Sequence, residues 1–93
     1  MVEMTAQNVV EILQQDNPRH DRGTMHLYAA AFIIYEEARA NIAKNGAVVA
    51  HPRTGEPLNN PYLQIMQKQR DALIKIANTK RPLKTDRLWQ LTT

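Results

Sequence analysis

The sequence predicts a small all-α protein: a helical hairpin of a long and a medium helix, plus a short N-terminal helix. A structured loop or short β-hairpin is expected between the main helices. Apolar residues recur at helical spacing in three segments, and proline and glycine interrupt the chain between the second and the third. A chain of 93 residues can bury only a thin core. We place residues 1–78 in a single helical domain and residues 79–93 in a basic C-terminal tail or short terminal helix.

The first predicted helix runs from about Thr5 to Gln15. Thr5 is a suitable N-cap, because its hydroxyl can accept a hydrogen bond from a free backbone N–H of the first turn. The helix is expected to end before Pro18, since the residue preceding a proline disfavours the helical conformation. Its apolar side consists of Val9, Val10, Ile12 and Leu13.

The long helix is predicted from about Thr24 to Asn45, with Gly46 placed to end it. Its apolar surface is too wide for one other helix of the same chain to cover easily. The aromatic stripe on this helix therefore has two interpretations, core of the chain or contact between subunits, and both stay open. The residues that we assign to packing within or between subunits, as a candidate oligomer interface, are Tyr28, Phe32, Tyr35 and Ile42.

Prolines and a glycine exclude a helix from residues 47–61, and Val48 and Val49 favour an extended backbone there. We expect an ordered loop that contains a short hairpin. The third helix begins with Asn60 as N-cap and Pro61 in the first position, where its missing N–H costs nothing. It is predicted to end near Asn78, and its apolar stripe consists of Tyr62, Ile65, Met66, Leu73, Ile76 and Ala77.

The net charge of +3 is divided unevenly along the chain. Residues 1–46 carry four basic and six acidic side chains, a net −2, whereas residues 47–93 carry eight and three, a net +5. A basic second half is typical of proteins that contact the phosphates of duplex DNA, although a merely solvated surface has the same composition. The candidate phosphate contacts are Lys68, Lys75, Lys80, Arg81, Lys84 and Arg87.

The sequence lacks the residues that several kinds of catalytic and metal-binding site require. The absence of cysteine excludes disulfides and thiolate zinc sites, and His20, His26 and His51 form no metal-binding motif. The sequence has neither a phosphate-binding P-loop nor a dinucleotide fingerprint. We therefore expect no catalytic residues, no metal and no cofactor. With no membrane-length apolar run and no signal-peptide pattern, we also expect an intracellular protein without membrane contact.

Several short pieces of the middle of the chain follow one another in a characteristic order and spacing. They are residues 26–32, 35–38, 42–46, 48–49, 52–55 and 60–63. On these pieces, the part of the chain from Asp21 to Ala77 resembles the small subunit of phage terminases. Many members of that family end with a Gly-Leu-Thr-Pro-x-x-Arg element, whose place is taken here by residues 77–83.

The resemblance implies a subunit without catalytic activity that binds viral double-stranded DNA in the host cytoplasm. It also implies a ring-like homo-oligomer that recruits and regulates the large terminase subunit during genome packaging. A different class remains as an alternative: a small helical protein–protein adaptor that does not bind DNA. An enzyme is the third and weakest hypothesis, because the catalytic constellations described above are missing.

Overall fold

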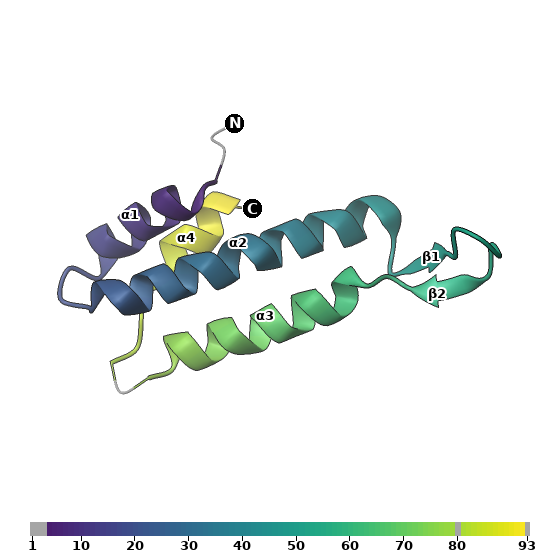
Figure 1. The fold of residues 1–93 in the computed structure, drawn as a ribbon. Helices are drawn as coiled ribbons and strands as arrows, with labels where there is room; N and C mark the ends of the chain where they lie inside the picture. Colours follow the sequence, from purple (N-terminus) through teal and green to yellow (C-terminus); the bar gives the residue numbers. More distant parts are fainter. Residues whose placement is uncertain (1–3, 80, 93) are drawn as a thin grey trace.

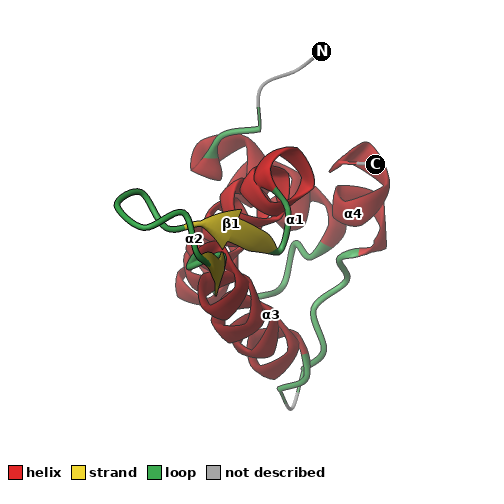
Figure 2. Cartoon of the chain, turned by 90° about the vertical axis from the view of Figure 1, so that its right-hand side faces the viewer, coloured by secondary structure: helices red, strands yellow, loops and turns green. Residues whose placement is uncertain are grey.

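The computed structural model describes residues 4–79 and 81–92, and it confirms the all-α fold with a short β-hairpin. The chain forms α1 (Ala6–Asp16), α2 (Arg22–Asn45), β1 (Val48–Ala50), β2 (Pro57–Asn59), α3 (Tyr62–Ala77) and α4 (Asp86–Thr92). Helices α2 and α3 run side by side along the length of the molecule, as Figure 1 shows. Seen along that length, α1 and α4 lie on one side of α2 and α3 lies on the other (Figure 2).

The ends of α1 follow from local chemistry. The Thr5 hydroxyl accepts a hydrogen bond from the backbone N–H of Asn8 at 3.2 Å, which confirms the predicted N-cap. At the other end, the backbone N–H of Asn17 donates to the carbonyl of Leu13 at 2.8 Å, and Pro18 follows. The inner side of α1 buries Val9, Val10 and Leu13 against α2, as the apolar pattern predicts.

Helix α2 is the longest helix of the described chain and packs against both α1 and α3. It has 24 residues and begins two residues before its predicted start. It ends at Gly46, whose φ of 87° is a conformation that favours glycine, and whose N–H donates to the carbonyl of Ile42 at 2.7 Å. Phe32, near the middle of α2, has no exposed surface and lies in the core with residues of α1, α3 and α4.

The β-hairpin projects beyond the helices at one end (Figure 1). Its strands are antiparallel, and Val49 pairs with Leu58 at the centre of the register. The buried side chain of Asn60 joins the hairpin to both main helices. Its Nδ2 donates to the carbonyl of Gly46 at 2.9 Å and to Oδ1 of Asn41 at 3.0 Å, while its Oδ1 accepts from the N–H of Tyr62 at 3.0 Å. Through the last of these contacts Asn60 caps the first N–H of α3, although the N-cap position is occupied by Pro61, one residue later than predicted.

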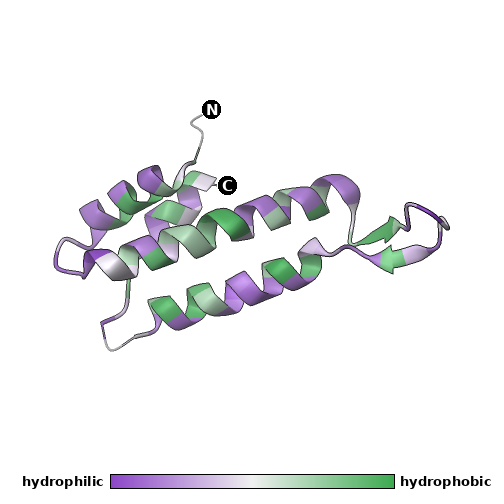
Figure 3. Ribbon diagram, in the orientation of Figure 1, coloured by the Kyte–Doolittle hydropathy of each residue, from purple (hydrophilic) through white to green (hydrophobic). Residues whose placement is uncertain are grey.

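Helix α3 carries apolar residues near both ends with a polar section between them (Figure 3), and its buried residue, Leu73, lies in the half nearer its C-terminus. Leu73 is buried, and Ile76 and Ala77 pack against the core. Tyr62 and Ile65, in the first turn, remain more than one third exposed. The reason is that α1 and α4 both lie at the other end of the α2–α3 pair (Figure 1), so that, within residues 4–79 and 81–92, α2 is the helix that covers this end of α3.

Candidate nucleic-acid interface

The two predicted basic residues of α3, Lys68 and Lys75, are exposed and one heptad apart. Asp71 lies between them in the sequence and is also exposed, and its carboxylate is 3.7 Å from the guanidinium of Arg70. This side of α3 therefore carries charges of both signs. A polyanion would meet two separated ammonium groups here rather than a continuous positive surface.

The remaining predicted contacts, Lys80, Arg81, Lys84 and Arg87, belong to the segment that follows α3. Lys80 lies outside the described residues. The Arg87 guanidinium forms an ion pair with Asp16, its Nε lying 3.0 Å from Oδ2, and also donates to Oε1 of Gln15 at 2.9 Å. The charge of Arg87 is thus balanced by a carboxylate of α1. Arg81 and Lys84 are both exposed, and neither forms a described ion pair.

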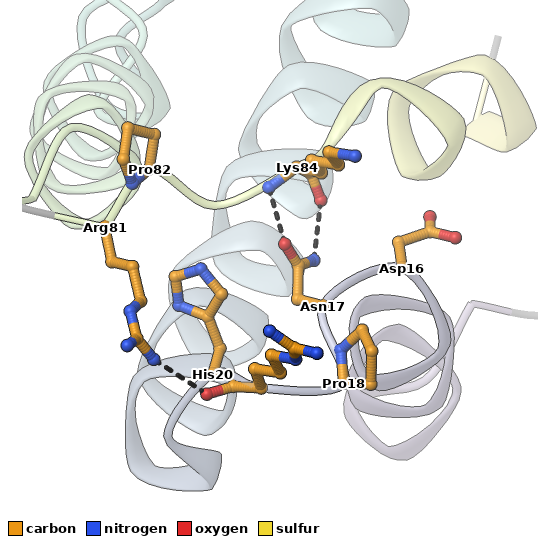
Figure 4. Close-up of a pocket in the computed structure, with 8 residues that line it drawn as sticks. Asp16, Asn17, Pro18, His20, Arg81, Pro82 and Lys84 are labelled. Atoms are coloured by element: carbon orange, nitrogen blue, oxygen red, sulfur yellow. Dashed lines mark hydrogen bonds between the residues drawn. The ribbon is translucent and has the colours of Figure 1, made fainter.

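Residues from two distant parts of the chain surround a cavity of about 340 Å³ at one end of the molecule (Figure 4). One wall is the turn between α1 and α2, and the other is the connection between α3 and α4. The residues that line it are Asp16, Asn17, Pro18, Arg19, His20, Arg81, Pro82 and Lys84.

Two sets of hydrogen bonds hold the walls together. The side-chain amide of Asn17, which is only 4% exposed, pairs with the backbone of Lys84. Its Oδ1 accepts from the N–H at 2.8 Å, and its Nδ2 donates to the carbonyl at 2.9 Å. Nearby, the Arg81 guanidinium donates to the carbonyl of Arg19 at 3.1 Å (Figure 4). These contacts fix the spacing between the basic side chains of the two walls.

The charge of this cavity is mainly positive. Arg19, Arg81 and Lys84 are cationic at neutral pH, and His20 contributes an imidazole that can donate or accept. The one carboxylate among the lining residues, that of Asp16, is already paired with Arg87. A shallow, positively charged concavity of this size suits an oxyanion such as a phosphate of a nucleic-acid backbone.

Sequence reasoning did not include Arg19 and His20 in the site. Both belong to residues 1–46, whose net charge is negative, and the candidate phosphate contacts were sought in the basic half of the chain. They reach the basic segment only through contacts between residues more than sixty positions apart. A local signal did exist, because a proline directly after an amphipathic helix, followed by polar residues, indicates a turn whose side chains lie at the surface.

The predicted interface residues of α2 divide into two groups. Tyr28 and Phe32 are almost fully buried within the chain, whereas Tyr35 and Ile42 are half-buried. The placement of the first two favours packing within one subunit. Burial raises the pKa of the Tyr28 phenol above its ordinary value of 10.0, and contacts with Trp89 and Thr85 act in the opposite direction.

The exposed apolar surface of α2 is instead a strip formed by Leu27, Ala30 and Ile34, which lie on one side of the helix at spacings of three and four residues. Leu27 is 64% exposed and Ile34 is 41% exposed. We call these three residues the α2 strip. Its side chains are apolar and stand in water in the isolated chain, which is typical of a protein–protein contact surface.

The described part of the chain, residues 4–79 and 81–92, gathers no group of three or more metal-binding side chains. Over the same residues, the structure holds no helix with both the length and the hydropathy of a membrane span.

Comparison with known proteins gives one result. Residues 7–79 match the family model described as phage terminase, small subunit, which confirms the resemblance drawn from residues 21–77. The match includes α1, α2, the hairpin and α3, and it stops before the segment that carries α4. No curated protein and no solved structure matches the chain.

Proposed function

Since the chain belongs to the phage terminase small subunit family, we propose that it is the non-catalytic subunit that binds viral double-stranded DNA during genome packaging. In this role it acts in the host cytoplasm and recruits and regulates the large terminase subunit, which supplies the catalytic activity. The observation that carries the DNA-binding part of the proposal is the basic cavity between the α1–α2 turn and the α3–α4 connection.

The proposed phosphate contacts are the residues of this cavity together with the two exposed lysines of α3. Arg19, Arg81 and Lys84 would each neutralise a backbone phosphate, as would Lys80, which directly precedes Arg81 in the sequence. Contacts of this kind position a protein on a duplex without reading its bases. We assign Arg87 to holding α4 on α1, because its guanidinium is already paired with Asp16. The additional contacts on α3 are Lys68 and Lys75.

We also propose that the protein acts as a homo-oligomer with ring-like arrangement. The support is the α2 strip, an apolar surface on the longest helix that the described part of the chain leaves exposed. A ring uses two different surfaces of each subunit, so the α2 strip would face a second surface on the neighbouring copy.

DNA binding is tested with the double variant Arg19→Gln/Arg81→Gln. Each lost phosphate contact reduces the slope of log affinity against log salt by about 0.9, so the double variant should flatten that slope by about 1.8. At 50 mM salt its affinity for a 30-base-pair duplex should fall by at least about tenfold. Fluorescence anisotropy across a salt series measures both quantities, and thermal melting checks that the variant folds.

The matched control is Lys44→Gln/Arg53→Gln, which removes the same charge from exposed residues at the end of α2 and in the hairpin. It should bind DNA nearly as the unaltered protein does. Equal losses in both double variants would contradict the assignment to the cavity. An unaltered protein that binds no duplex at 50 mM salt would instead favour the adaptor without DNA binding.

A further inference from the structure

Residues 81–92, here called the C-terminal segment, dock on a surface built by α1 and α2. Leu88 is fully buried, and the Trp89 ring meets the rings of Phe32 and Tyr35 edge-on, with centroids 4.7 and 5.7 Å apart. The Trp89 indole N–H donates to the hydroxyl of Tyr28 at 3.0 Å. We call this surface, from Asp16 and Asn17 to the aromatic rings of α2, the acceptor groove.

The groove recognises the segment in three chemically distinct ways. Asn17 forms hydrogen bonds with both backbone polar groups of Lys84, so this contact does not depend on the side chain at that position. Asp16 and Gln15 bind the Arg87 guanidinium. The rings of α2 contact Trp89, and Leu88 is buried in the core. Together these contacts make a peptide-binding site whose ligand has a defined sequence.

The segment packs far less closely against α3, although α3 directly precedes it. A cavity of about 390 Å³ separates Trp89 and Thr85 from Ile74 and Ala77 of α3. One backbone hydrogen bond, from the N–H of Leu83 to the carbonyl of Ala77 at 3.1 Å, links the two sides. Figure 2 shows α4 beside α1 and apart from α3. The groove, rather than the neighbouring helix in the sequence, therefore determines where the segment lies.

The connection to α3 is suited to a change of direction. Residues 82–85 form no helix or strand, and Pro82 cannot continue a helix from α3. If the chain turned outward at Arg81 and Pro82, ahead of the residues that the groove holds, the contacts of the groove with Lys84, Arg87 and Trp89 of another copy would be identical to those with its own. The hydrogen bonds that would differ are those of this connection: from the N–H of Leu83 to the carbonyl of Ala77, from the hydroxyl of Thr79 to the carbonyl of Arg81, and from the Arg81 guanidinium to the carbonyl of Arg19. Segments exchange between identical chains where the connection changes and the docking contacts do not.

From these observations we propose that the acceptor groove binds the C-terminal segment of a second copy of this chain, so that neighbouring subunits exchange α4. The proposal rests on the proposed homo-oligomer, because subunits already held together present their segments at an effective concentration of about millimolar. In this arrangement one copy supplies Asp16, Asn17 and the α2 rings, and its neighbour supplies Lys84, Arg87 and Trp89.

The experiment uses the Asp16–Arg87 ion pair in two complementary variants of the full chain. Asp16→Arg sets a cationic groove against a cationic segment, and Arg87→Asp sets an anionic segment against an anionic groove. Neither variant can pair these positions by itself. In a mixture of the two, however, each segment finds an oppositely charged groove on the other variant. The double variant in a single chain pairs the positions again and serves as the reference.

The two variants are unfolded, mixed in equal amounts and refolded, so that exchange is not limited by the opening rate. The expected result is one melting transition at the temperature of the double variant, above that of either single variant. Two superimposed transitions at the temperatures of the single variants would overturn the proposal. Refolding the mixture keeps the measurement informative even if one single variant is unfolded when alone.

A matched control uses Glu36 and Arg39, an ion pair at 2.7 Å within α2 that cannot be exchanged. Glu36→Arg and Arg39→Glu, mixed in the same way, should show no rise in melting temperature. A rise in this control equal to that of the Asp16–Arg87 mixture would show association through another face and would overturn the proposal. DNA binding is measured with other residues, Arg19 and Arg81, so failure of exchange and failure of the DNA-binding function are separate outcomes.

Discussion

Single buried polar side chains connect parts of this molecule that are distant in sequence. Asn17 and Asn60 each use both atoms of the side-chain amide, and each holds the backbone of another segment. The sequence predicted Asn60 as a helix cap, because asparagine before proline is a local signal. It did not predict that Asn17 would hold Lys84, since nothing near Asn17 in the sequence indicates a partner 67 positions away.

Tyr28 offers a prediction at this scale, because its hydroxyl accepts the hydrogen bond of the Trp89 indole and is mostly buried. Tyr28→Phe should lower the free energy of unfolding by about 1 kcal/mol at pH 8. Since burial raises the pKa of the folded phenol, the stability that Tyr28 contributes is full below pH 10 and declines above it. The difference between the variant and the unaltered protein should therefore stay constant up to pH 10 and shrink above it. Urea unfolding at several pH values measures it, and a difference that stays constant above pH 10 as well would contradict the pKa argument.

Each element of the fold has its own degree of predictability. The long helix was predictable from its apolar spacing. The helix ends near Thr5, Gly46 and Asn60 were predictable because each of these residues is a signal contained within a few positions. The exposure of Tyr62 and Ile65 could not be predicted, because their spacing along the helix is that of core residues. Whether a helical face is covered depends on where the other helices lie, and here α1 and α4 both lie at the opposite end.

The hairpin leads to a prediction at the scale of elements, because Asn60 is the side chain that joins it to α2 and α3. Asn60→Ala removes the cap of α3 and leaves the carbonyl of Gly46 without this donor, and should cost about 2 kcal/mol of stability. Amide hydrogen exchange should accelerate first at the backbone N–H groups of His51 and Asn60, which bond within the hairpin. Asn59→Ala, at the adjacent exposed position, is the control and should change little. Uniform acceleration throughout the four helices would contradict a local role.

At the scale of the whole molecule, the protein is elongated, and its hydrophobic core lies at the end opposite the β-hairpin. Its principal extents are 53, 31 and 18 Å. The buried core residues belong mainly to α1 and to the half of α2 beside it, and α3 and α4 contribute Leu73 and Leu88. The division of charge predicted a basic region, but the structure distributes it over an end cavity and a mixed-charge face of α3. The sequence also indicated that α2 has more apolar surface than the chain covers. It could not say which part, because that depends on how Tyr28 and Phe32 turn inward and leave Leu27 and Ile34 outside.

The α2 strip therefore gives a prediction about assembly. Leu27→Glu/Ile34→Glu introduces two charges that would have to be desolvated at a subunit contact, which is far more costly than leaving them in water. Both side chains are exposed in the single chain, so its fold should persist. Light scattering should show that the mass of the assembled protein falls to that of one or a few chains, while circular dichroism stays unchanged. The control, Gln64→Glu/Gln67→Glu, adds the same charge to exposed positions of α3 and should leave the assembly intact. If the unaltered protein is itself monomeric at micromolar concentration, or if both variants dissociate equally, the α2 strip is not the contact between subunits.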